Sequence, residues 1–143
     1  MTKKLQLEMH HAAISVSDLG RSMRWYESRL GFKLINRFEN PKLDAKIVLM
    51  ALGRYHLELV CFKEQKPLPN YRKTLASNLK TIGTKHMALG TNDIEQAYRI
   101  LKGKGVKFDS KPRVGGSGHK YAFFKDPDGV LIELFELNPF SDH

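Results

Sequence analysis

The chain has 143 residues, of which 41% are hydrophobic, and a formal net charge of +9. This length and composition suit one compact domain spanning residues 1–143, and no apolar run approaches the ~20 residues that a membrane-spanning helix needs. The single cysteine, Cys61, excludes an intrachain disulfide, and no apolar stretch of the signal-peptide type follows the charged N-terminus. We therefore expect a cytoplasmic protein without a membrane partner.

The excess positive charge favours anionic partners and lies mainly in two stretches. Residues 63–85 hold six Lys or Arg against Glu64 alone, and residues 99–120 hold seven against Asp109 alone. The chain has no recognised nucleic-acid-binding motif, and its basic residues are scattered over predicted loops and helix surfaces. We therefore expect a small anionic substrate and no nucleic-acid partner.

The first half of the chain predicts a strand, a helix and three more strands. The opening strand covers residues 9–16 and the helix residues 19–30. Met23, Tyr26 and Leu30 form one apolar stripe at helical spacing, which supports the helix. The three further strands are expected near residues 32–38, 45–51 and 55–62.

The second half repeats this plan after a connection at residues 63–83, which contains a candidate helix through Leu75 and Leu79. A strand at 85–91 precedes a helix that starts at Ile94 and ends at Gly103 or Gly105. Strands follow near 106–109, 120–125 and 130–136, with a turn at residues 126–129 (Asp-Pro-Asp-Gly). The sequence thus predicts module 1 at 9–62, a linker at 63–83 and module 2 at 84–137.

Two copies of one pattern lie 75 residues apart, and each carries a histidine and a glutamate at matching positions. His11 corresponds to His86 and Glu58 to Glu133. A repeat at a fixed offset indicates duplicated structural units, which would bring these four metal-ligating side chains together. The flanking residues correspond in hydrophobic pattern as well: HAAISVSDL at 11–19 with HMALGTNDI at 86–94, and LEL at 57–59 with IEL at 132–134.

Alternate side chains share one face of a strand, and the residues that share a face with His11 and His86 are consistent with a cavity there. Glu58 and Glu133 lie in apolar strand runs, where an unpaired buried carboxylate would be very costly, so a cation should compensate them. The residues that share a face with the two histidines are small and leave room for a ligand: Ala13, Ser15, Ala88 and Gly90.

An alternative without a metal places Glu58 and Glu133 on edge strands facing solvent, and the two histidines in hydrogen bonds within the core. The coincidence of four residues at one offset favours the metal site. Two imidazoles and two carboxylates suit one divalent ion, Ni²⁺, Zn²⁺, Co²⁺, Mn²⁺ or Fe²⁺, and the sequence does not rank these metals.

The chain resembles the vicinal oxygen chelate superfamily, which includes glyoxalase I, methylmalonyl-CoA epimerase, extradiol dioxygenases and fosfomycin and bleomycin resistance proteins. It is most similar to the metal-binding members of the glyoxalase I type. The resemblance implies an α+β fold of two βαβββ modules, whose curved mixed sheets enclose a metal, often with modules exchanged or joined across a homodimer. It covers residues 9–137 and rests on the motifs at 11–19, 25–26, 30–32, 57–59, 85–89 and 126–134.

The resemblance also implies a chemistry. Extradiol dioxygenases leave empty the position that Glu58 occupies, whereas glyoxalase I has the full His/Glu/His/Glu set. This implies a metal-dependent lyase or isomerase that abstracts a proton beside a carbonyl and stabilises a metal-chelated enediolate. His11 and His86 would be fixed ligands, Glu133 the first choice for the base and Glu58 its counterpart on the opposite face. An Fe(II)-dependent dioxygenase and a non-catalytic ligand-binding or resistance protein are the alternatives.

Two departures from the glyoxalase pattern concern the substrate. The arginine that helps hold glutathione in bacterial glyoxalase I falls at Ser15, and the asparagine four residues beyond the first glutamate falls at Phe62. Both changes remove glutathione contacts, so another anionic carbonyl compound is as well supported as a glutathione adduct.

Three further features are candidates for roles near the site. His56 lies two residues before Glu58 and shares its face, which fits either an additional group near the metal or an ordinary strand residue. His10 has the opposite phase and is expected to be structural or exposed. The glycine-rich segment 114–118, flanked by basic residues, suits either an anion site or a mobile hairpin loop.

Overall fold

The computed structural model describes residues 2–139, and the chain divides between Gln65 and Lys66 into two compact units, called unit 1 and unit 2. The division falls within residues 63–83, the segment predicted as the connection. Each unit has its own mixed β-sheet, which confirms the predicted α+β class. None of the helices in the described part of the chain is both long enough and apolar enough to cross a membrane.

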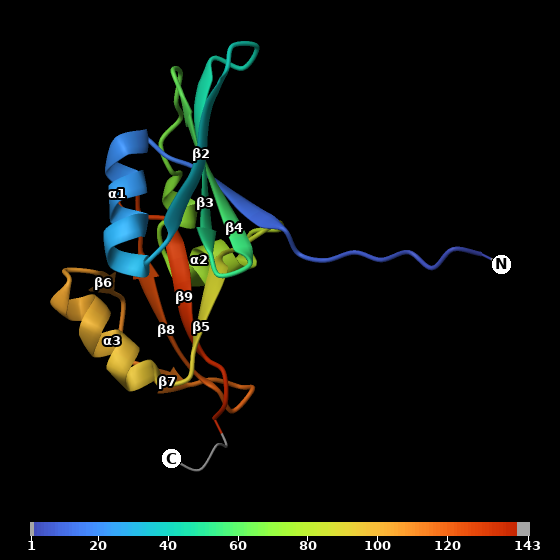
Figure 1. The fold of residues 1–143 in the computed structure, drawn as a ribbon. Helices are drawn as coiled ribbons and strands as arrows, with labels where there is room; N and C mark the ends of the chain where they lie inside the picture. Colours follow the sequence, from blue (N-terminus) through green and yellow to red (C-terminus); the bar gives the residue numbers. More distant parts are fainter. Residues whose placement is uncertain (1, 140–143) are drawn as a thin grey trace. The chain divides into compact units, whose positions relative to one another are not determined.

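Unit 1 is a four-stranded sheet with the strand order β1-β4-β3-β2 and one helix (Figure 1). β1 runs parallel to β4, whereas the β2–β3 and β3–β4 pairs are antiparallel. The elements are β1 (His11–Ser15), α1 (Leu19–Leu30), β2 (Lys33–Asn40), β3 (Ala45–Leu52) and β4 (Tyr55–Phe62).

The core of unit 1 lies between its sheet and α1, which contacts β2, β3 and β4. Leu57 and Leu59 of β4 are fully buried. Tyr26 of α1 is also fully buried, and its ring meets those of Trp25 and Phe32 edge to face at centroid distances of 5.0 and 5.8 Å. The apolar stripe predicted for this helix therefore packs on one face of the sheet, and the residues that alternate with Leu57 and Leu59 point to the other.

Unit 2 repeats the arrangement with the order β5-β9-β8-β6, and β7 also pairs with β8 (Figure 1). β5 runs parallel to β9, and the other pairs are antiparallel. The elements are a 3-10 turn η1 (Asn70–Arg72), α2 (Leu75–Lys80), β5 (Met87–Thr91), α3 (Ile94–Gly103), β6 (Lys107–Phe108), β7 (Arg113–Val114), β8 (Lys120–Lys125) and β9 (Leu131–Glu136).

The two halves share the strand register that positions the glutamates. Ala13 pairs with Glu58 between β1 and β4, and Ala88 pairs with Glu133 between β5 and β9. Each of these residues lies 75 positions from its counterpart, so the sequence offset is also a structural one. The duplicated strand-helix-strand plan predicted from the repeat is therefore confirmed.

One strand of the repeat differs between the halves. β2 is continuous over eight residues, with an irregular register between Leu34 and Asn36. Its counterpart in unit 2 is split into β6 and β7, and the sequence predicted only the first of these, at 106–109. Pro112 lies in the interruption and lacks the N–H that a continuous strand would donate, which accounts for part of the break.

Both long helices begin at an aspartate that caps them in the same way. Asp18 accepts a hydrogen bond from the Arg21 N–H at 2.9 Å, and Asp93 accepts one from the Gln96 N–H at 3.0 Å. We expect Asp18→Ala and Asp93→Ala each to lower the free energy of unfolding by about 1 kcal/mol, since each leaves a helical N–H without its acceptor. Urea unfolding measures this loss. The matched Asp→Asn variants keep an acceptor and should stay within about 0.5 kcal/mol of the native chain, and an equal loss in both sets would show that capping is not the cause.

Candidate metal centre

In unit 2, the structure brings together the histidine and the glutamate that the sequence singled out. His86 Nε2 lies 2.9 Å from Glu133 Oε2. The side chains are only 19% and 17% exposed, so the pair is largely withdrawn from water. His86 directly precedes β5, and Glu133 is in the middle of β9.

Aromatic packing holds this pair from one side. Phe123 of β8 is directly opposite Glu133 in the strand register, and its ring meets the His86 ring edge to face at a centroid distance of 4.9 Å. The Nδ1 atom of His86 is buried and has no hydrogen-bond partner among the described residues. The imidazole is thus fixed by Phe123 and Glu133, with one ring nitrogen still unsatisfied.

This geometry fits a divalent metal ion. Metal–ligand bonds of ~2.1 Å at about 90° place two donor atoms roughly 3 Å apart, and the His86–Glu133 distance of 2.9 Å matches that spacing. An ordinary hydrogen bond has the same length. Imidazole and carboxylate are both common ligands of divalent transition metals, so the donor atoms of this pair also fit a metal ion.

In unit 1, the corresponding residues share a face of the sheet but do not form the close pair seen in unit 2. His11 pairs with His56 in the strand register and Glu58 with Ala13, which places His11 and Glu58 diagonally across adjacent strands. No hydrogen bond or ion pair joins their side chains. His11 Nδ1 is instead 2.9 Å from Nδ1 of His10.

The strand orders contradict one part of the alternative without a metal, namely that the two glutamates lie on edge strands. Glu58 lies on β4, between β1 and β3, and Glu133 lies on β9, between β5 and β8. Both glutamates are therefore on interior strands, whereas that alternative requires edge strands. Both are also only half-buried, which leaves their carboxylates accessible to a ligand.

The four small residues expected beside the histidines are all exposed, but the space above them differs. Ala13, Ser15 and Ala88 are exposed and leave the sheet open. Gly90 differs, because a Cβ atom added there would lie 2.5 Å from Cδ2 of Leu137. The Leu137 side chain thus occupies the space above this glycine, and the opening in unit 2 is confined to the Ala88 end.

Among residues 2–139, no group of three or more His, Cys, Asp or Glu side chains is arranged to hold a metal ion. The structure thus joins two of the four predicted ligands, His86 and Glu133, and places the other two on one face of unit 1. The four-ligand centre stays a prediction.

The histidines near Glu58 form a stack that the sequence did not indicate. His10 is exposed, as expected, and its ring stacks on that of His56 with centroids 4.8 Å apart. His56 is half-buried and lies beside His11 in the register. Strand phase alone predicted no contact between His10 and His56, because His10 precedes β1 and does not follow its alternation.

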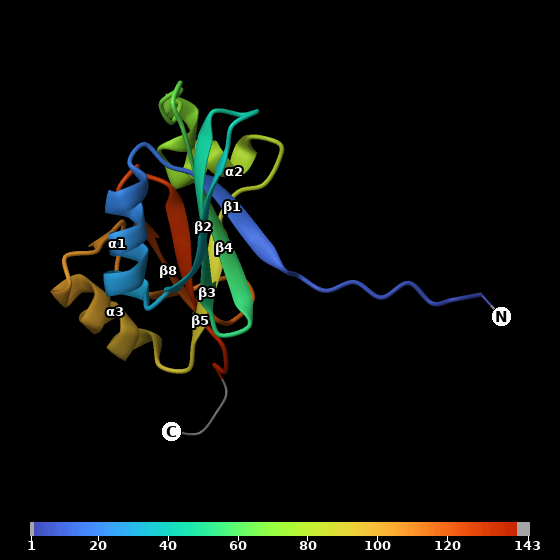
Figure 2. The same ribbon diagram turned by 45° about the horizontal axis from the view of Figure 1, so that its top comes forward.

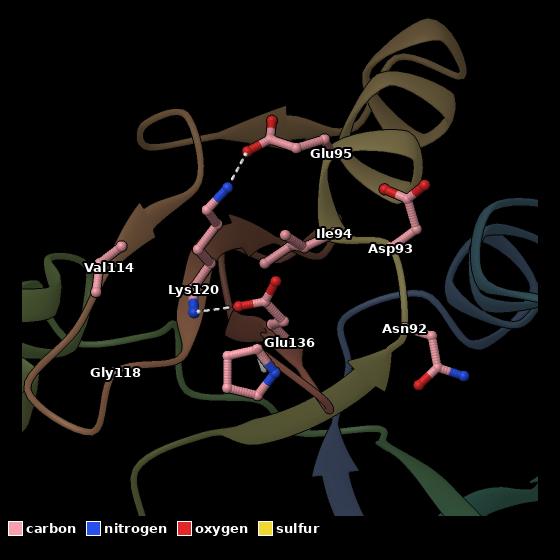
Figure 3. Close-up of a pocket in the computed structure, with 9 residues that line it drawn as sticks. Asn92, Asp93, Ile94, Glu95, Val114, Gly118, Lys120 and Glu136 are labelled. Carbon is pink, nitrogen blue, oxygen red and sulfur yellow. Dashed lines mark hydrogen bonds and ion pairs between the residues drawn. The ribbon is translucent and has the colours of Figure 1, made fainter. Parts of the chain in front are cut away.

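Val114 and Gly118 of the glycine-rich segment line a cavity on the α3 side of the unit 2 sheet, which has a volume of about 360 Å³ (Figure 3). The Lys120 ammonium pairs with Glu95 at 3.3 Å, and its backbone N–H donates to Glu136 at 2.9 Å. These carboxylates disfavour an anion there. Glu136 is three residues from Glu133 and faces the opposite side of β9, so this cavity is separate from the His86–Glu133 pair.

A row of aromatic rings beside Glu133 was missed from the sequence. Tyr121 pairs across strands with Phe135, and Tyr121 and Phe123 lie edge to face at 5.8 Å. His119 stacks on Phe135 with centroids 4.9 Å apart. Side chains alternate between the two faces of β8, so residues 121, 123 and 125 share one face and residues 120, 122 and 124 the other. Both sets contain aromatic residues, so this alternation did not indicate which face carries the aromatic row.

Comparisons with known proteins agree with this fold. The model of the Glyoxalase/Bleomycin resistance protein/Dioxygenase superfamily matches residues 8–134. A lactoylglutathione lyase of Haemophilus influenzae is 31% identical over 132 residues, or 91% of this chain and 93% of the relative. YwkD, an uncharacterized protein of Bacillus subtilis, is 30% identical over 129 residues, covering 90% and 95%. The crystal structure of a glyoxalase family protein from Enterococcus faecalis has a TM-score of 0.78 at 28% identity and covers 90% of this chain and 97% of that chain. The chain therefore belongs to the glyoxalase/bleomycin resistance protein/dioxygenase superfamily, which is the vicinal oxygen chelate superfamily.

Proposed function

We propose that this protein is a metal-dependent lyase or isomerase of the glyoxalase type, with one divalent ion bound by His11, Glu58, His86 and Glu133. The observation that carries the proposal is the close His86–Glu133 pair, together with the identical register of Glu58 and Glu133 on their strands. A relative named lactoylglutathione lyase supports the same class.

The residues have different roles in this reaction. His11 and His86 hold the ion through neutral imidazole nitrogens, and the ion, when bound, polarises a substrate carbonyl as a Lewis acid. Glu133 takes the proton from the carbon beside that carbonyl, because its carboxylate is already positioned and only 17% exposed. Glu58, which is half-buried, would return a proton taken up from solvent on the opposite face of the substrate, and Glu133 would release its proton to solvent to complete the cycle.

The substrate is proposed to be a small anionic carbonyl compound. Ser15 and Phe62 stand on the same face of unit 1 as Glu58, where the glyoxalase pattern has glutathione-binding arginine and asparagine. A hydroxyl and a phenyl ring replace the cation and the amide, so the contacts to a glutathione chain are lost. The +9 net charge still attracts an anion over distance.

Removing and restoring the metal tests the proposal. The protein is purified without added metal, its Ni, Zn, Co, Mn and Fe contents are measured, and it is then stripped with a chelator. We expect stripping to lower the rate of hydrogen exchange beside the carbonyl of 2-oxo acids and of the methylglyoxal–glutathione hemithioacetal by at least ~100-fold, and one of the five ions to restore it.

The outcomes separate the function classes. Exchange that is independent of metal would contradict the proposal. Uptake of O₂ by the iron form with a catechol would instead identify a dioxygenase, and tight ligand binding without metal would identify a non-catalytic binding protein. A rate on the hemithioacetal far above that on 2-oxo acids would overturn only the substrate part.

A further inference from the structure

The most exposed apolar side chains of unit 1 lie in the segment that precedes β1. Leu5, Leu7 and Met9 are 78%, 85% and 80% exposed. The segment, residues 2–10, is extended and runs away from the sheet of unit 1 (Figures 1 and 2). We call it the N-terminal arm. Three large apolar residues held in water at regular spacing indicate a surface that is covered by a partner.

The arm has the pattern of a strand but has no strand partner. Apolar residues alternate with polar ones from Lys4 to His10, which is the period of a β-strand with one apolar face. The sequence predicted a strand from residue 9, whereas β1 begins at His11, which pairs with His56 of β4. Within the described chain, the only backbone bond made by the arm joins the His56 N–H to the His10 carbonyl at 3.1 Å.

The charges of the arm complement those of a second copy. In an antiparallel pair with Gln6 opposite Gln6 of the partner subunit, Lys4 faces Glu8 of the partner subunit and Leu5 faces Leu7 of the partner subunit. The twofold axis repeats each of these contacts. Opposite charges and apolar pairs directly across an antiparallel ladder stabilise it. Neither Lys4 nor Glu8 has an ion-pair partner among residues 2–139.

We propose that residues 3–9 form this antiparallel ribbon with the arm of a second copy and so join two chains into a symmetric dimer. An isologous contact of this kind closes on itself and leaves no free arm to recruit further chains. An isolated two-stranded ribbon is marginal in water, but each arm here continues β1 of a folded sheet, which lowers the entropy that pairing must overcome. The dimer does not depend on the metal chemistry.

Cysteine cross-linking tests the register. In a Cys61→Ser background, Gln6→Cys places two thiols opposite each other at the twofold axis, and mild oxidation should convert most of the protein to a covalent dimer. Leu5→Cys and Leu7→Cys are matched controls, since neither faces its own copy. Each alone should cross-link less than about a tenth as much, whereas a mixture of the two should form the mixed dimer. Equal cross-linking of all variants, or none by Gln6→Cys, would overturn the proposal.

Charge exchange gives an independent test without new thiols. Lys4→Glu and Glu8→Lys each place like charges across the ribbon and should raise the dimer dissociation constant at least ~10-fold, as measured by sedimentation equilibrium. The double variant K4E/E8K restores opposite charges and should recover most of the affinity. Far-UV circular dichroism confirms that all three fold, since the arm lies outside the core. A double variant as weak as the singles, or singles that dimerise normally, would contradict the ribbon.

Discussion

His11→Ala and His86→Ala are each expected to weaken divalent-metal binding about 1,000-fold, roughly 4 kcal/mol, although the two residues belong to different units. The reason is that one ion would draw one imidazole from each half, and loss of either removes a strong ligand. Calorimetric titration of the stripped protein with Ni²⁺ or Zn²⁺ measures the affinity and the stoichiometry, which should be one ion per chain.

The matched control is His119→Ala. His119 is half-buried in unit 2 and stacks on Phe135, so its loss also removes an imidazole but no proposed ligand. Its metal affinity should stay within about threefold of the native value. If His86→Ala abolishes binding and His11→Ala does not, unit 2 binds metal without unit 1, and the four-ligand centre is wrong.

The sequence predicted the parts of this fold that depend on a repeated local pattern. The 75-residue offset implied equal registers for Glu58 and Glu133, and the paired strands have them. The helix predicted at residues 19–30 is α1, because an apolar stripe and an aspartate cap specify a helix locally. The Asp126 turn also formed: its Oδ1 accepts the Asp128 and Val130 N–H groups, and Gly129 has a φ of +85°.

What the sequence did not predict depends on contacts between residues far apart in the chain or outside regular strands. The Phe123 contact with His86 depends on the register between β8 and β9. A slip of one residue would move the Phe123 side chain to the opposite face of the sheet. The His10–His56 stack forms just before β1 begins, where strand alternation does not yet apply. Gly90 seemed to leave space above the sheet, yet Leu137, 47 residues later, occupies it.

The neighbours of Glu133 on the adjacent strands leave its carboxylate with few hydrogen-bond donors. Ala88 flanks it on one neighbouring strand and Phe123 on the other. Neither side chain can donate a hydrogen bond to the carboxylate, so His86 is its neighbour for that role and a bound cation would supply the remaining compensation.

Glu133→Gln is expected to lower kcat at least 1,000-fold, about 4 kcal/mol in the activation free energy, on whichever substrate shows metal-dependent exchange. The amide keeps the shape of the side chain and an oxygen for the ion, but it cannot accept the substrate proton. Glu136→Gln on the same strand is the matched control; it faces the opposite side of the sheet and should change kcat less than about threefold. Steady-state kinetics at saturating metal separates the loss of the base from weaker metal binding. If Glu58→Gln instead causes the larger fall, the proton is taken from the unit 1 side, and the assignment of the base to Glu133 is wrong.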